Sequence, residues 1–147
     1  MTVPARVSLL TLGVADVARS TAFYEALGWR RSSASTPEIT FVHTVGPILA
    51  LFGRQDLADD ATVDGAGEGF RAVTIAINMG SSDEVDRAYD AWVAAGGRGV
   101  RPPGPAVYEG GYMAYVTDPD DHLWELAHNP FFPIDDAGHA SLPDAPG

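Results

Sequence analysis

The segment Ala26-Leu27-Gly28-Trp29-Arg30 has a shorter counterpart, Ala95-Gly96-Gly97-Arg98, in the second half of the chain. In both places apolar residues at helical spacing run into glycine, which commonly ends a helix, and a strand-like run follows. When the order of helices and strands repeats along a chain, the repeat determines the architecture of the fold. The match predicts two modules built on one plan.

Outward from these helix ends, each module is predicted to contain a strand, a helix and three further strands. The first has a strand at 6–14, a helix at 17–27 capped by Asp16, and strands at 29–33, 39–44 and 48–52. The second has a strand at 71–79, a helix capped by Ser81 or Ser82, and strands at 98–100, 112–117 and 122–127. The expected fold class is α+β, in which two βαβββ modules in tandem form a curved sheet around a central trough, with the helices outside.

We expect a single domain over residues 1–147. Module one covers about 6–53, and an exposed linker rich in acidic and small residues covers about 54–70. Module two covers about 71–130, and a C-terminal tail at 131–147 is expected to fray at its end.

The composition excludes several classes of function. The net charge of −11 argues against nucleic acid and against an anionic membrane surface, because both are bound by clustered Lys and Arg. The chain has no cysteine, which excludes disulfides, thiolate nucleophiles and Cys-based zinc sites. An apolar run at 7–14 is too short to span a bilayer and lacks the features of a signal peptide, so we expect a cytoplasmic protein.

Two motifs on this duplicated plan carry a resemblance to a known family. The first is LGVAD at 12–16 with Phe23-Tyr24 and Leu27-Gly28, and the second is DPDDHLWEL at 118–126. They resemble the strand-to-helix opening and the Asp-Pro-Asp-Gly hairpin of the vicinal-oxygen-chelate superfamily, which includes glyoxalases, bleomycin-resistance proteins and extradiol dioxygenases. The resemblance covers residues 7–130. It implies the fold and a homodimer, but not a reaction, because the family's chemistry is diverse.

One residue of the hairpin departs from the family pattern. Asp121 stands where the family usually has glycine, at a position that often favours a left-handed backbone. Aspartate tolerates that conformation better than most residues, so we expect the hairpin to form.

The resemblance also implies four metal-ligand positions, on the first and fourth strands of each module, that usually hold His, Gln or Glu. In this sequence those positions hold Leu9, Ala50, Thr74 and Glu125. Leucine and alanine cannot ligate, threonine is a poor neutral ligand, and one carboxylate cannot hold a transition metal alone. We therefore expect no metal and no other cofactor.

Glu125 and Tyr115 are the candidate catalytic residues. Because Trp124 and Leu126 should face the helix by alternation, Glu125 is expected to face the trough. The simpler alternative is a solvated strand carboxylate. Tyr115 lies where a tyrosine contacts substrate in the family's phosphonate-processing members, and would be a donor near Glu125. A tyrosine packed in the sheet with its hydroxyl at the rim is an equal alternative.

The expected ligand-binding residues lie on the trough-facing strands or on a nearby loop: Leu9, Thr11, Ala50, Phe52, Thr74, Tyr108, Tyr112, Tyr115 and Glu125. Strand propensity also explains the threonines, and ordinary core packing also explains the apolar members. Tyr108 and Tyr112 flank Gly110-Gly111, a pair that suggests either a loop closing over a ligand or a plain connector.

Three functions remain open at this point. The first is a metal-independent small-molecule-binding protein of the glyoxalase/bleomycin-resistance type, for antibiotic or metabolite sequestration, with Glu125 favouring a cationic or hydrogen-bond-donating ligand. The alternative is a metal-free isomerase, cyclase or lyase with Glu125 as base and Tyr115 as acid. A metal-dependent lyase or dioxygenase is disfavoured because the ligand positions are largely lost. The expected partners are thus a small molecule and a second copy of the chain.

Overall fold

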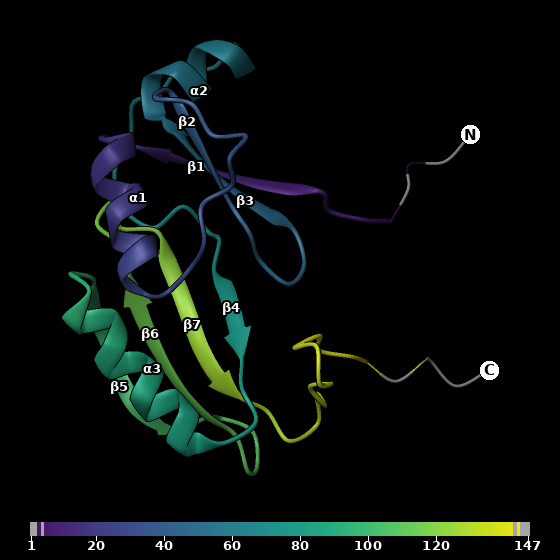
Figure 1. Ribbon diagram of the computed structural model, residues 1–147. Coiled ribbons are helices and arrows are strands. Elements are labelled where there is room, and N and C mark those ends of the chain that lie inside the picture. Colours follow the sequence, from purple (N-terminus) through teal and green to yellow (C-terminus); the bar gives the residue numbers. More distant parts are fainter. Residues whose placement is uncertain (1–2, 4, 143, 145–147) are drawn as a thin grey trace. The chain divides into compact units, whose positions relative to one another are not determined.

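The computed structural model describes residues 3, 5–142 and 144. The chain divides into two compact units, Met1–Gly69 and Phe70–Gly147, each built around its own sheet (Figure 1). The described residues form seven strands in two sheets and three helices, which confirms the α+β class. Within the same residues, every helix is too short or too polar to cross a membrane.

The first unit contains a three-stranded sheet and two helices. Its elements are β1 (Leu9–Val14), α1 (Val17–Ala26), β2 (Ile39–Val42), β3 (Ile48–Gly53) and α2 (Arg54–Ala61). The strand order is β1-β3-β2, with β1 parallel and β2 antiparallel to β3. The α1 helix begins where Asp16 accepts a hydrogen bond from the backbone N–H of Arg19, 3.0 Å away, as the sequence predicts.

The first unit departs from the expected plan at its second strand. Only an isolated bridge between Arg31 and Val42 forms where a strand was expected at 29–33. The hydroxyls of Ser32 and Ser35 accept hydrogen bonds from the backbone N–H groups of Ala34 and Phe41. Such local side-chain acceptors compete with a strand ladder for the same donors, which explains the irregular segment.

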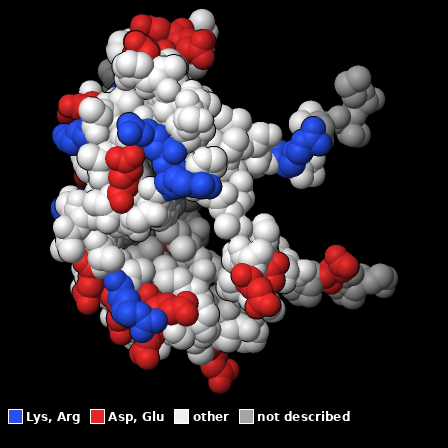
Figure 2. All heavy atoms as spheres, viewed as in Figure 1, with Lys and Arg blue, Asp and Glu red and all other residues white. Residues whose placement is uncertain are grey.

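The acidic segment after β3 contains a helix that its composition did not suggest. The α2 helix packs against β1 and β3, and Ala58 is its buried residue. Its exposed side carries Asp56, Asp59 and Asp60. Acidic side chains gather at the top of Figure 2, where α2 lies in Figure 1. The segment expected to be linker therefore contributes one helix to the first unit.

The second unit has a four-stranded sheet with one helix. Its elements are β4 (Ile75–Asn78), α3 (Ser82–Ala94), β5 (Arg98–Pro105), β6 (Tyr112–Thr117) and β7 (Leu123–His128). The strand order is β4-β7-β6-β5, in which β4 runs parallel to β7 and the other neighbours are antiparallel. The α3 helix packs against β5, β6 and β7 (Figure 1). Ser81 caps α3 by accepting the backbone N–H of Glu84.

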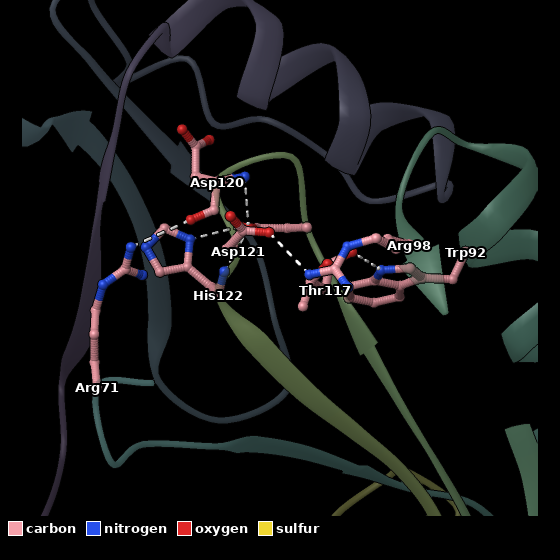
Figure 3. A network of polar contacts seen from close by, with 8 residues as sticks. Arg71, Trp92, Arg98, Thr117, Asp120, Asp121 and His122 are labelled. Carbon is pink, nitrogen blue, oxygen red and sulfur yellow. Dashed lines mark hydrogen bonds and ion pairs between the residues drawn. The ribbon is translucent and has the colours of Figure 1, made fainter. Parts of the chain in front are cut away.

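The end of α3 is locked to the sheet through Trp92. Its indole Nε1 donates a buried hydrogen bond to the carbonyl oxygen of Thr117, 2.8 Å away (Figure 3), and its ring lies 5.4 Å from that of Trp124. A Cβ atom on Gly97 would lie 2.3 Å from Cδ1 of Trp92 and 2.7 Å from the Thr117 oxygen. The helix can therefore turn into β5 only because residue 97 has no side chain.

A buried aspartate organises the hairpin between β6 and β7. Asp118, whose side chain is fully buried, accepts backbone hydrogen bonds through Oδ1 from Asp120 and His122, and its Oδ2 lies 2.8 Å from Nδ1 of His122. Asp120 and His122 are labelled in Figure 3. Asp121 has a φ of 63°, so the expected left-handed residue is present. The hairpin fixes how β6 and β7 pair, and hence which side chains lie opposite each other.

We predict that Gly97→Ala lowers the free energy of unfolding by about 1–3 kcal/mol, because the new methyl group overpacks the Trp92 contact. Urea unfolding measures the loss. Gly80→Ala is the matched control, since a Cβ there meets only ordinary contacts with Glu84, and it should change stability by about 0.5 kcal/mol or less. Equal effects of the two substitutions would contradict the role given to Gly97.

We predict that Asp118→Ala destabilises the protein by about 2–4 kcal/mol, because buried backbone donors lose their acceptor. Asp118→Asn should cost much less, since the amide oxygen can still accept from Asp120 and His122. Thermal unfolding of the two variants separates lost hydrogen bonding from lost charge. If the Asn and Ala variants were equally destabilised, the charge of Asp118 would be the main contribution.

Candidate functional site

The face of the second sheet that does not contact α3 carries the candidate site. Glu125 of β7 is paired with Tyr115 of β6, and Tyr115 is paired with Arg101 of β5. Their neighbours Trp124 and Leu126 are buried on the other side of β7, where the Trp124 ring lies against α3. We call the side that bears Arg101, Met113, Tyr115 and Glu125 the Glu125 face.

A direct hydrogen bond joins the two residues that the sequence singles out. The Tyr115 hydroxyl donates to Oε2 of Glu125 over 2.9 Å, and both side chains are half-buried. Burial, followed by this hydrogen bond, raises the pKa of Tyr115 above its ordinary value of 10.0. The phenol therefore stays protonated at neutral pH and acts as a fixed donor to the carboxylate.

Tyr108 reaches the same face from the hairpin between β5 and β6. The loop is closed by a hydrogen bond from the Ala106 N–H to the Gly111 carbonyl, 2.9 Å long. A Cβ on Gly111 would lie 2.0 Å from Cε2 of Tyr108. Residues 111, 113 and 115 alternate onto one side of the sheet, so the Tyr108 ring lies on the Glu125 face. Burial and the nearby Glu125 charge raise the pKa of Tyr108.

Arg101 supplies the positive charge of this face. Its Nη2 donates to the carbonyl oxygen of Pro105 over 3.1 Å, and its Nη1 lies 3.5 Å from the sulfur of Met113. Its positive charge acts to lower the pKa of Tyr115, against the burial and the hydrogen bond that raise it. Within the described part of the chain, Arg101 forms no ion pair with Glu125, because its donors are directed to the β5–β6 hairpin.

The sequence did not identify Arg101. Its place opposite Tyr115 follows from a pairing of β5 and β6 that shifts register between Gly99 and Arg101 and again between Arg101 and Gly104. These irregularities, with Pro102 and Pro103 in between, break the simple alternation on which a strand is assigned two faces.

The other expected residues fall into separate groups. On the first sheet, Thr40 and its pairing partner Leu51 face α1, because the Thr21 hydroxyl of α1 donates to Thr40. The opposite face of that sheet therefore bears the four residues expected from the first module: Leu9, Thr11, Ala50 and Phe52. Thr74 of the second unit is exposed and precedes β4.

Tyr112 does not share the Glu125 face. Its side chain points to the α3 side of β6, where its hydroxyl donates to Oδ1 of Asp86 over 2.8 Å. Tyr108 and Tyr112, both expected among the ligand-binding residues, therefore lie on opposite faces of the second sheet. Adjacent strand residues point to opposite faces, and the Gly110-Gly111 turn returns Tyr108, but not Tyr112, to the side of Glu125.

The side chains present do not fit the transition metal that the fold family implies. Of the four equivalent positions, Leu9, Ala50 and Thr74 offer no good ligand, and the Glu125 carboxylate is engaged by Tyr115. Among the described residues, no group of three or more His, Asp or Glu could hold a metal ion. One carboxylate is too few donors for such an ion.

Many solved structures have the same fold as this chain. The chain is 35% identical to a glyoxalase-related enzyme from Fulvimarina pelagi, with a TM-score of 0.85 over 95% of this chain and 99% of that one. A glyoxalase/bleomycin resistance protein/dioxygenase from Nocardioides is 27% identical, with a TM-score of 0.72 over 87% of this chain and 85% of that one. A lactoylglutathione lyase from Agrobacterium tumefaciens is 20% identical, with a TM-score of 0.64 over 86% and 95%.

A comparison with curated proteins found no match. The family model described as Glyoxalase/Bleomycin resistance protein/Dioxygenase superfamily matches residues 6–126, which is most of the chain. That range includes both motifs quoted from the sequence, and both Tyr115 and Glu125. The chain therefore belongs to the Glyoxalase/Bleomycin resistance protein/Dioxygenase superfamily.

Proposed function

We propose that this protein is a metal-independent small-molecule-binding protein of the glyoxalase/bleomycin-resistance type, and that its ligand contacts the Glu125 face. One observation carries the proposal: Glu125 is the sole carboxylate at the four equivalent ligand positions, and a tyrosine hydroxyl binds it. A carboxylate held in this way remains an acceptor for a ligand. Sequestration of an antibiotic or a metabolite requires only that the ligand is bound, without a reaction.

The surroundings of Glu125 support binding of an organic ligand. Tyr108 and Tyr115 contribute aromatic surface with hydroxyl groups, and Met113, which is buried beside Arg101, makes the same side of the sheet apolar. Small-molecule sites commonly combine mostly apolar walls with a few well-placed polar groups. The Glu125 face has this composition.

The alternative function is a metal-free isomerase, cyclase or lyase that uses the same two residues. The pair of Tyr115 and Glu125, 2.9 Å apart, favours it, because an acid and a base in contact can serve proton transfer. The raised pKa of Tyr115 disfavours it, since a phenol that holds its proton more tightly is a poorer general acid at neutral pH. Binding is therefore the better-supported function of the pair.

A thermal-shift screen against antibiotics and metabolites tests the proposal, because a bound ligand raises the melting temperature by mass action. We expect at least one compound to stabilise the wild type, and Glu125→Gln to weaken its binding by about tenfold, as expected for loss of a charged hydrogen bond. Mass spectrometry should recover that compound unchanged after incubation with the protein.

Glu38→Gln is the matched control, because it removes the same charge from an exposed position of the first unit. It should leave the affinity unchanged. Compounds that stabilise the wild type and the Glu125→Gln variant equally would contradict binding at the Glu125 face. Chemical conversion of the compound by the wild type, abolished in Glu125→Gln, would establish the enzymatic alternative instead.

A further inference from the structure

Glu125 has no ion-pair partner among the described residues. Its carboxylate receives one hydrogen bond, from the neutral phenol of Tyr115. Arg101, on the same face, is directed to Pro105 and Met113. A half-buried carboxylate without a cationic partner favours a ligand that supplies one, since partly buried charges are usually paired.

Aromatic rings lie beside this carboxylate. Tyr115 is opposite Glu125 in the ladder, and the Tyr108 ring lies over Gly111 on the same face. On the other side of Glu125, its partner in β4 is Ala76, a small and exposed residue that leaves room for a ligand. The approach to Glu125 is thus crowded by rings on the β6 side and open on the β4 side.

Gly111 holds Tyr108 in this position. The ring occupies the volume that a side chain at residue 111 would fill, with Cε2 only 2.0 Å from the built Cβ. Gly104, in the preceding strand of the same hairpin, has no atom within 4 Å of its built Cβ and does not show a positive φ. Two glycines of one hairpin therefore differ in a testable way: only Gly111 makes contact with the ring.

We propose that the ligand of the Glu125 face is an organic cation with an attached flat apolar group, and that Tyr108, positioned by Gly111, is a specificity-determining wall of its site. The ammonium or amidinium group pairs with Glu125 and lies near the tyrosine rings, where cation–π attraction adds to the ion pair. This inference rests on the proposed function and adds the chemical class of the ligand.

The net charge of the whole chain also favours a cationic ligand. The net charge is −11, from 20 acidic and 9 basic residues, and acidic side chains are visible in several places on the surface in Figure 2. A surface of this sign raises the local concentration of cations and lowers that of anions. An anionic ligand would approach against this potential, and the guanidinium of Arg101 on the same face already donates to the carbonyl oxygen of Pro105.

Three probes of one shape test the ligand class: benzylammonium, benzyl alcohol and benzoate, titrated into the protein and followed by NMR chemical shifts. We expect benzylammonium to bind about tenfold more tightly than benzyl alcohol, and benzoate to bind most weakly. Glu125→Gln should abolish the preference for the cation. Glu38→Gln should retain it.

A double-mutant cycle tests the role of Gly111. Gly111→Ala should weaken benzylammonium binding several-fold by displacing the Tyr108 ring, and Gly104→Ala should have no effect. In a Tyr108→Ala background, Gly111→Ala should cause no further loss, because the ring it displaces is already absent. Unfolding by urea checks that each variant is folded. A merely structural role for Gly111 would give the same loss in both backgrounds and would overturn this part of the proposal.

Other outcomes separate this inference from the proposed function. Equal binding of the three probes, lost in Glu125→Gln, would contradict the cationic class but retain a small-molecule site at the Glu125 face. Tighter binding of benzoate would also overturn the inference. If none of the three bound, the inference would be wrong, while the antibiotic and metabolite screen would still decide the proposed function on its own.

Discussion

The hydrogen bond from Tyr115 to Glu125 depends on the register of β6 and β7. A slip of one residue would move Glu125 to the α3 side and would expose Trp124 on the other. The register is set by the hairpin at 118–122, in which buried Asp118 satisfies the turn's backbone donors. The core contact of Trp92 with Trp124 and with the Thr117 carbonyl holds the same strands against α3. The site is thus a consequence of how the core and the hairpin are built.

Much of this arrangement can be predicted from the sequence, because it follows from local patterns. Asp16 and Ser81 are recognisable caps, and alternation along β7 assigns Trp124 and Glu125 to opposite faces. The α+β class and the β6–β7 hairpin follow from the same signals. Asp121 is informative as well, since its left-handed backbone was expected from the family's glycine at that place.

The remainder could not be predicted because it depends on contacts that are not local. The strand expected at 29–33 is reduced to an isolated bridge beside serine-mediated turns, and α2 forms in an acidic segment because it packs against β1 and β3. Arg101 lies on the Glu125 face only through register shifts in β5. Tyr108 and Tyr112 lie on opposite faces of the sheet because of the backbone conformation of the Gly110-Gly111 turn. Hydrophobic periodicity does not predict that conformation.

The residues at the four positions where the family resemblance implies metal ligands determine whether this chain can hold a metal. Where the family's metal-using members hold ligands, this chain has Leu9, Ala50 and Thr74, and the remaining carboxylate is bound by Tyr115. The most direct measurement is elemental analysis of the purified protein after equilibration with Mn, Fe, Ni and Zn salts. The account predicts metal far below one ion per chain and equal to that of Glu125→Gln, since a lone carboxylate does not retain these ions. A stoichiometric ion that is lost on Glu125→Gln substitution would contradict it.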